Sequence, residues 1–111
     1  MSKFIGIEER VVAAYQEKHL KARPMSVVVW GGCCCALGAI AHGMGEVQST
    51  DDAGALIGLT LRESYDFAFG FDHTLDPKRA DRPRHCEAYD AGVRTAIAVQ
   101  AAGLVADKAD W

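Results

Sequence analysis

Small residues dominate the stretch VVVWGGCCCALGAIAHGMG at positions 27–45, which constrains the fold more than any other part of the chain. Its second half predicts a helix from Cys33 to about His42, because alanine, leucine and isoleucine follow the cysteines. Gly38 costs such a helix roughly 1 kcal/mol relative to alanine, so we expect another helix to pass very close to it. Free cysteine is among the most buried residue types. The three consecutive cysteines are therefore interpreted as small packing residues.

The four cysteines also allow a second interpretation, a thiol or metal site built on the run Cys33–Cys35. Zinc takes four ligands in a tetrahedron, whereas adjacent side chains on a helix project about 100° apart, so the run cannot supply every ligand. One or two of its members would need partners brought in from the C-terminal half by folding. The candidate ligands are Cys34, Cys35, Cys86 and His85. This alternative predicts that Cys86 lies near the cysteine run in space.

Two further elements are expected in the N-terminal half. Apolar residues recur at helical spacing over residues 7–23, with acidic residues early and basic residues late, which predicts a helix that ends before Pro24. The β-branched run MSVVVW at 25–30 predicts either a short extended segment or the buried start of the next helix.

The second half of the chain predicts three more helices. A cap at 49–51 can start a short helix. Thr60 and Glu63 form the Thr-x-x-Glu pattern of a capping box, and Gly70 is expected to end the helix that they begin. The polar segment 72–85 predicts a loop.

Pro83 stands where a last helix can start, and small and apolar residues then continue at helical spacing to Gly103. The fold class that follows is all-α: a compact single domain of four to five helices over residues 1–111, with room for one short extended segment near 25–30. The core is expected to draw on apolar residues of every helix: Val11, Tyr15, Leu37, Ile40, Leu56, Leu59, Tyr65, Phe69, Tyr89, Val93, Ile97 and Val99.

Composition argues against several classes of function. The chain has 111 residues and a net charge of −3, whereas nucleic acids and anionic membranes select clustered positive charge. No apolar run reaches the roughly 18 to 20 residues of a membrane span, and the N-terminus shows no export signal. Reduced thiols and a cytoplasmic location are expected. Because no catalytic set or cofactor motif is identifiable, we expect neither an enzyme nor a bound cofactor.

Residues 53–70 resemble a helix-turn-helix, which gives a third functional hypothesis, a DNA-binding regulator. In that motif the second helix must offer side chains to bases and phosphates. Here Arg62 is accompanied by Glu63 and Asp66, so phosphates would be repelled rather than neutralised. The pattern therefore favours a structural helical hairpin.

Two pieces of the chain resemble a pattern found in small uncharacterised helical proteins of bacteria and their phages. The pieces are Cys-Ala-Leu-Gly-Ala at 35–39 and GLTLRESYDFAFGFD at 58–72, the second being similar to a Gly-Leu-Ser/Thr-x-x-Glu helix that ends in Gly-Phe-Asp. Gly92 corresponds to a glycine of the helix that follows in those proteins. The resemblance implies a helical fold and carries no activity.

The favoured function is a small non-enzymatic module that binds, regulates or inhibits another protein. This hypothesis fits the size, the acidity and the lack of a catalytic set. Phe67, Phe69 and Phe71 lie near one helix end and are expected to form an exposed protein-binding patch. Such proteins often self-associate, so a homodimer is expected as well.

Overall fold

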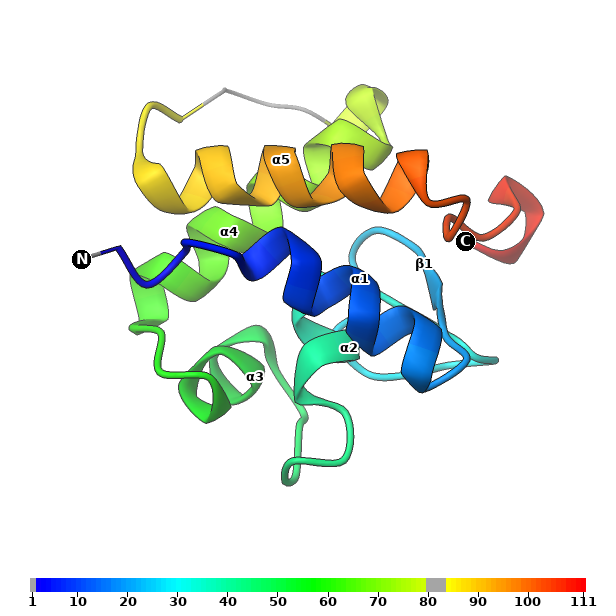
Figure 1. Cartoon of the computed structure of the whole chain (residues 1–111), viewed down its shortest axis with the longest axis horizontal. Helices are drawn as coiled ribbons and strands as arrows, with labels where there is room; N and C mark the ends of the chain where they lie inside the picture. Colours follow the sequence, from blue (N-terminus) through cyan, green and yellow to red (C-terminus); the bar gives the residue numbers. More distant parts are fainter. Residues whose placement is uncertain (1, 80–83) are drawn as a thin grey trace.

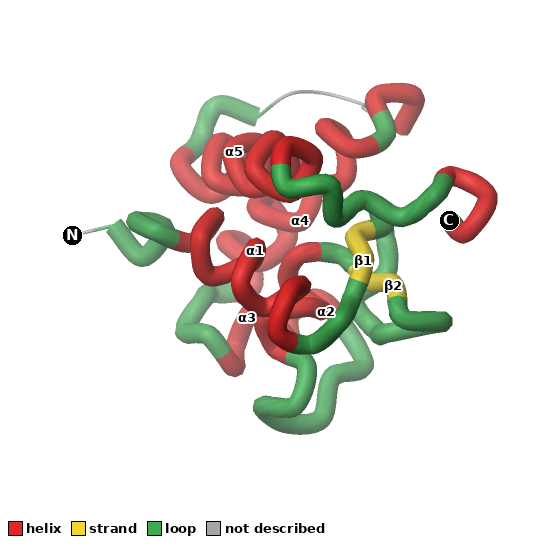
Figure 2. Tube along the Cα trace, turned by 45° about the vertical axis from the view of Figure 1, so that its right-hand side comes forward, coloured by secondary structure: helices red, strands yellow, loops and turns green. Residues whose placement is uncertain are grey.

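The computed structural model describes residues 2–79 and 84–111, and this part of the chain is mostly helical (Figures 1 and 2). Its helices are α1 (Ile7–Glu17), α2 (Ala36–Ala41), α3 (Thr50–Leu56), α4 (Leu61–Leu75) and α5 (Glu87–Ala101). Two-residue strands β1 (Lys21–Ala22) and β2 (Cys33–Cys34) form a parallel sheet, and the 3-10 helices are η1 (Pro77–Arg79) and η2 (Lys108–Asp110). The expected compact helical domain is confirmed, with a small sheet added.

Helix α5 packs against both α1 and α4, and its contact with α4 brings the two main chains together (Figure 1). A Cβ atom at Gly70 would lie 2.1 Å from the main-chain oxygen of Tyr89, and one at Gly92 would lie 2.2 Å from that of Phe67. Both glycines are inside their helices, so they permit a close approach that any side chain would block. The prediction that Gly70 ends its helix is wrong, since α4 continues to Leu75.

Helix α1 also ends at a different place from the one expected. It stops at Glu17 instead of continuing to residue 23, because His19 adopts a φ of 55° and the main-chain nitrogen of Leu20 donates to the oxygen of Tyr15. The chain then enters β1, which pairs in parallel with β2 (Figure 2). Because the two paired segments are distant in the sequence, no local sequence pattern predicts this pairing.

The segment around the cysteine run differs from expectation in three ways. Residues 25–30 form a loop, and the extended pieces are β1 and β2 instead. The predicted helix at 33–42 starts only at Ala36, after Cys35 as its N-cap. Gly38 does mark a close approach, because its Cβ would lie 2.3 Å from the main-chain oxygen of Val27. Its neighbour is thus the 25–30 loop and not a second helix.

The predicted caps of the middle helices are confirmed. The hydroxyl of Ser49 accepts a hydrogen bond from the main-chain nitrogen of Asp52 at the start of α3. At the start of α4 the Thr60 nitrogen donates to Glu63 Oε1 at 2.8 Å, and the Glu63 nitrogen donates to Thr60 Oγ1 at 3.2 Å. The last helix is confirmed as α5, but it begins at Glu87 with Cys86 as its N-cap, so the start predicted at Pro83 is wrong; Pro83 itself lies outside the described residues.

Most of the expected core residues are buried. The confirmed set is Val11, Tyr15, Leu37, Ile40, Leu59, Tyr89 and Val99, while Leu56, Phe69 and Val93 are half-buried. Tyr65 and Ile97 are exposed, Ile97 by 55%, because they lie on faces of α4 and α5 that no other described element covers. None of the helices in residues 2–79 and 84–111 is long and apolar enough to cross a membrane.

Alanine at Gly70 or Gly92 is expected to lower the free energy of unfolding by about 2 to 3 kcal/mol, because the new methyl group must push two main chains apart. The roughly 1 kcal/mol by which alanine exceeds glycine in helix propensity offsets part of this cost. Urea titration followed by circular dichroism measures the change. Gln100→Ala, an exposed change on α5, serves as the control and should stay within about 0.5 kcal/mol. Wild-type stability in both glycine variants would contradict this account of the contact.

Candidate functional site

The cysteine run lies inside the core and has the properties of packing residues. Cys33, Cys34 and Cys35 are all buried, and the hydroxyl of Tyr15 donates to the main-chain oxygen of Cys34 at 2.7 Å. Burial raises the pKa of the Cys34 thiol to about 12, and burial together with the nearby Asp72 carboxylate raises the pKa of the Cys35 thiol further. These two thiols therefore stay protonated at neutral pH and are poor nucleophiles and metal ligands.

The other two predicted ligands lie at the start of α5. Cys86 is the half-buried N-cap of this helix, and its Sγ donates to Asp66 Oδ2 at 3.6 Å, while His85 is exposed. Cys34, by contrast, pairs with β1 on the sheet. Among the described residues no group of three histidine, cysteine or carboxylate side chains is arranged to hold a metal ion. The proposed metal set is therefore not assembled in this fold.

The exposed patch expected at the phenylalanines is absent. Phe67 and Phe71, one helical turn apart, are completely buried, and the ring of Phe67 stacks on that of Phe4 with centroids 6.1 Å apart. Phe69 points to another side of α4, where it is half-buried against His73 and the guanidinium of Arg84. The prediction of a three-phenylalanine contact surface is wrong, because the period of α4 turns two of the three rings into the core.

The predicted helical hairpin is formed by α3 and α4. The two helices approach closely, since a Cβ at Gly54 in α3 would lie 1.7 Å from the hydroxyl oxygen of Ser64 in α4. Arg62 is 88% exposed, but its Nε lies 3.8 Å from Asp66 Oδ2, so the cation that a DNA phosphate would need faces a carboxylate. The hairpin supports a structural role better than the DNA-binding hypothesis.

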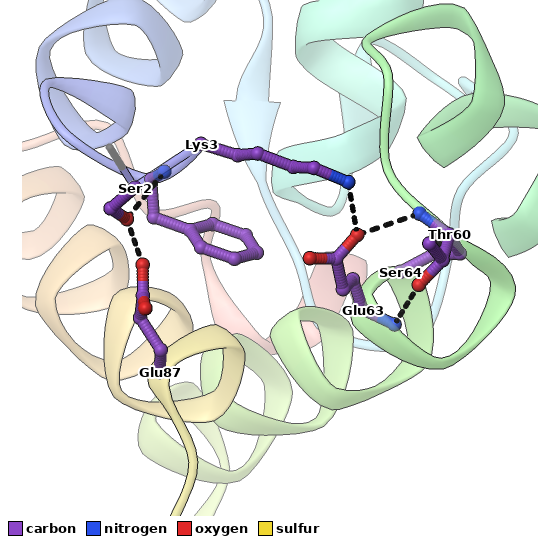
Figure 3. Close-up of polar contacts among 7 residues, drawn as sticks. Ser2, Lys3, Thr60, Glu63, Ser64 and Glu87 are labelled. Carbon is purple, nitrogen blue, oxygen red and sulfur yellow. Dashed lines mark hydrogen bonds and ion pairs between the residues drawn. The ribbon is translucent and has the colours of Figure 1, made fainter.

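An open cleft of about 470 Å³ lies where the N-terminal segment crosses the first turns of α4 and α5. Figure 3 shows Ser2 directed toward Glu87 and Lys3 directed toward Glu63. Lys3 Nζ lies 2.8 Å from Glu63 Oε1. The hydrogen bond from Lys3 lowers the pKa of the Glu63 carboxyl, which also closes the capping box. The charged groups here are thus used to fasten the N-terminal segment to the two helices.

The buried carboxylate of Asp66, which lines the same cleft, is paired with an arginine of the chain itself. Asp66 is only 5% exposed and accepts a hydrogen bond from Arg84 Nη1 at 2.6 Å. Its second oxygen accepts from the Cys86 thiol. The carboxylate therefore holds the end of the 72–85 segment and the start of α5 together.

A different part of the molecule exposes apolar side chains. Trp30 is 74% exposed, and Val28 in the same loop is exposed as well. The same loop borders a hollow of about 220 Å³, lined by the valines at 27–29 and by Gly38, His42, Gly43, Gly45 and Val47. We call Val28, Trp30 and this hollow the Trp30 surface. Met25, two positions before Val27, and Met44, next to Gly43, are also more than half exposed.

The loop that carries this surface is held in place at both ends. The main-chain nitrogen of Cys35 donates to the oxygen of Ser26, and Trp30 and Cys33 exchange two main-chain hydrogen bonds of 2.9 and 3.0 Å. Between the last two residues, Gly31 and Gly32 have φ values of 60° and 77°, which only glycine adopts without strain. Trp30 is therefore presented on an anchored turn.

The sequence did not predict this surface, because the cysteines and phenylalanines were the residues whose chemistry indicated a site. One local signal was present: Trp-Gly-Gly before a cysteine has the two-glycine pattern of a tight turn. Comparisons of the chain with protein-family models, with curated proteins and with solved structures find no match. Its function is consequently inferred from the residues themselves.

Thiol reactivity is expected to separate Cys86 from the cysteine run. In the folded protein an aromatic disulfide reagent should label Cys86 quickly, because it is half-exposed, and should leave Cys34 and Cys35 unlabelled until denaturant is added. Absorbance of the released thiolate measures both phases. The fast phase should vanish in Cys86→Ser and persist in Cys33→Ala. Rapid labelling of the run in native protein would refute the packing interpretation.

Stability is expected to fall at alkaline pH because of the buried thiols. The folded-state pKa of Cys34 is about 12, whereas an unfolded cysteine titrates near about 8.5. The unfolded chain therefore releases this proton first as the pH rises, and stability falls by up to about 1.4 kcal/mol per pH unit above roughly pH 9. Urea titrations across this range should show a shallower fall for Cys34→Ala and an unchanged one for Cys86→Ala. The same slope in wild type and Cys34→Ala would exclude Cys34 as a cause.

Proposed function

We propose that the chain is a small non-enzymatic protein-interaction module whose contact surface is the Trp30 surface. The observation that carries the proposal is Trp30 itself, which is 74% exposed on a turn fixed by main-chain hydrogen bonds. Burial of a tryptophan offers a large free-energy gain, and tryptophan is enriched among the residues that dominate binding energy at protein interfaces. A protein gains nothing in stability from holding so large an apolar ring in water.

The way the loop is held supports the same proposal. Binding costs conformational entropy wherever a loop or side chain must become ordered. Here the loop main chain is already fixed by Ser26, Cys33 and Cys35, and the oxygen of Val27 packs on Gly38. A partner would therefore meet a surface that needs little ordering.

The alternatives find less support in the residues. The thiol or metal hypothesis requires Cys34 and Cys35 to be accessible, whereas both are buried with raised pKa values. The DNA-binding hypothesis requires a free cation on α4, whereas Arg62 faces Asp66. Self-association remains part of the proposal, because a second copy is one partner that the Trp30 surface could meet.

Trp30→Ala is expected to abolish or strongly weaken binding while leaving the fold intact. The variant should retain wild-type stability within about 0.5 kcal/mol, because the ring is mostly in water. Bait proteins carrying wild-type sequence, Trp30→Ala or Ile97→Ala are used for affinity capture, and each captured protein is then purified and titrated calorimetrically. Loss of a hot-spot residue costs about 2 kcal/mol or more, which corresponds to roughly thirtyfold in Kd.

Ile97→Ala is the matched control, since Ile97 is also an exposed apolar residue but lies on α5. Its binding should equal that of the wild type. Sedimentation velocity of each of the three proteins by itself tests whether the partner is a second copy of the chain. In that case the wild type and Ile97→Ala should associate at high concentration, and only Trp30→Ala should remain a monomer. Equal binding by wild type and Trp30→Ala, with equal association states, would overturn the proposed function.

A further inference from the structure

The 25–30 loop carries a projecting aromatic side chain and also borders a cavity. Trp30 is 74% exposed and follows directly on Val29, the last of the three consecutive valines that line the hollow. Val28 lines the hollow as well and is itself exposed. Met44 is 52% exposed and stands in the chain between two lining glycines. The hollow therefore has exposed apolar residues among and next to its lining, and a large exposed ring adjoins them.

The size and lining of the hollow suit a single large apolar side chain. Its volume is about 220 Å³, below the roughly 300 to 1,000 Å³ of pockets that enclose small-molecule ligands. Valines and glycines make up most of its lining. Glycine has no side chain, so it lets a neighbouring group approach the main chain closely. An aromatic ring carried by another protein is thus a better occupant than a free ligand.

The sequence that forms most of this surface carries no formal charge. Residues 24–45 contain no Asp, Glu, Lys or Arg, although these types make up 24% of the chain. Glu46 follows, exposed between Gly45 and Val47, and its Oε1 accepts a hydrogen bond from Gln48 Nε2 at 2.9 Å. Charge complementarity gives much of the specificity between different proteins, and residues 24–45 offer none. Two-fold pairing brings like groups together, so it favours an uncharged contact.

We infer that the Trp30 surface binds a second copy of the chain, with Trp30 of each protomer inserted into the hollow of its partner. A surface that presents both the projecting ring and the cavity is self-complementary, as a two-fold dimer requires. Reciprocal insertion uses the ring and the hollow of both copies, so the assembly closes at two instead of continuing into a fibre. This inference rests on the proposed function and names the partner of its surface.

The dimer is expected to be weak because the surface is small. A stable interface of standard size uses roughly 20 to 30 residues on each side, more than the loop and the lining of the hollow provide. Two buried tryptophan rings should supply most of the binding energy. The dissociation constant is therefore expected to be on the order of micromolar, and sedimentation velocity from about 1 μM to about 1 mM covers that range.

Two variants separate the ring from the cavity. Trp30→Ala keeps the hollow, whereas Val28→Asp keeps the ring and puts a carboxylate in the hollow's lining, which an entering indole must desolvate. Either variant alone loses both insertions and should dimerise about a thousandfold more weakly than wild type. An equimolar mixture restores one insertion, so its heterodimer should be only about thirtyfold weaker. Ile97→Asp, the matched control on α5, should dimerise as wild type does.

Two further measurements test the contact and its charge. Mixed samples of isotopically labelled and unlabelled protein should show intermolecular nuclear Overhauser effects between the Trp30 ring and the methyl groups of the lining valines. Circular dichroism of every variant checks that the fold is retained. Glu46→Gln should dimerise at least as tightly as wild type, because two copies of a carboxylate near the contact can only repel each other. Weaker binding by Glu46→Gln would overturn the second copy in favour of a cationic partner.

The remaining outcomes distinguish this inference from the proposed function. Wild-type protein that stays monomeric at about 1 mM would overturn the inference and leave the proposed function standing, with a different protein as partner. Dimerisation that Trp30→Ala abolishes but the mixture does not restore would overturn the insertion into the hollow. Assemblies that grow beyond two copies would overturn the two-fold contact. A dimer unaffected by Trp30→Ala would overturn the inference, and equal capture of other proteins by that variant would overturn the proposed function too.

Discussion

The main-chain contact between α4 and α5 is the constraint on which the rest of the structure depends. With no side chain at Gly70 or Gly92, the two longest helices approach until each backbone touches the other. Phe67 and Phe71 are then enclosed between α4 and its neighbours, and the start of α5 is brought to Asp66. Helix α5 also packs on α1. A single methyl group at this contact would disturb every one of these relations.

The contacts of the cysteine run with its neighbours explain why these potentially reactive residues have a structural role here. The cysteine run forms β2 and the cap of α2, and its main chain fastens the 25–30 loop through Ser26 and Trp30. The cysteine side chains are buried, while Val28 and Trp30 of the loop are exposed. Free cysteine fits such a place because it is small and apolar. The cysteines matter to the proposed function by positioning Trp30.

Local signals in the sequence predicted the helices well and the rest of the fold poorly. The caps at Ser49 and Thr60 involve atoms three residues apart, so the pattern carries its own geometry. The end of α1 depended on a left-handed histidine, His19, and the sheet on pairing between residues 21 and 33. Neither follows from helical periodicity. For the candidate site, the Trp-Gly-Gly pattern predicts the turn, but no local pattern predicts that the Trp30 side chain is exposed.

The sequence by itself determined where most helices begin, that the fold is helical, and that small residues must meet at close range. Only the tertiary structure decided which neighbours meet at those residues, placing a loop on Gly38 and a helix on Gly70. It also decided which aromatic rings are buried, enclosing Phe67 and leaving Trp30 in water. The physical reason is that burial depends on atoms brought together from distant parts of the chain, whereas capping and helix propensity act within a few residues.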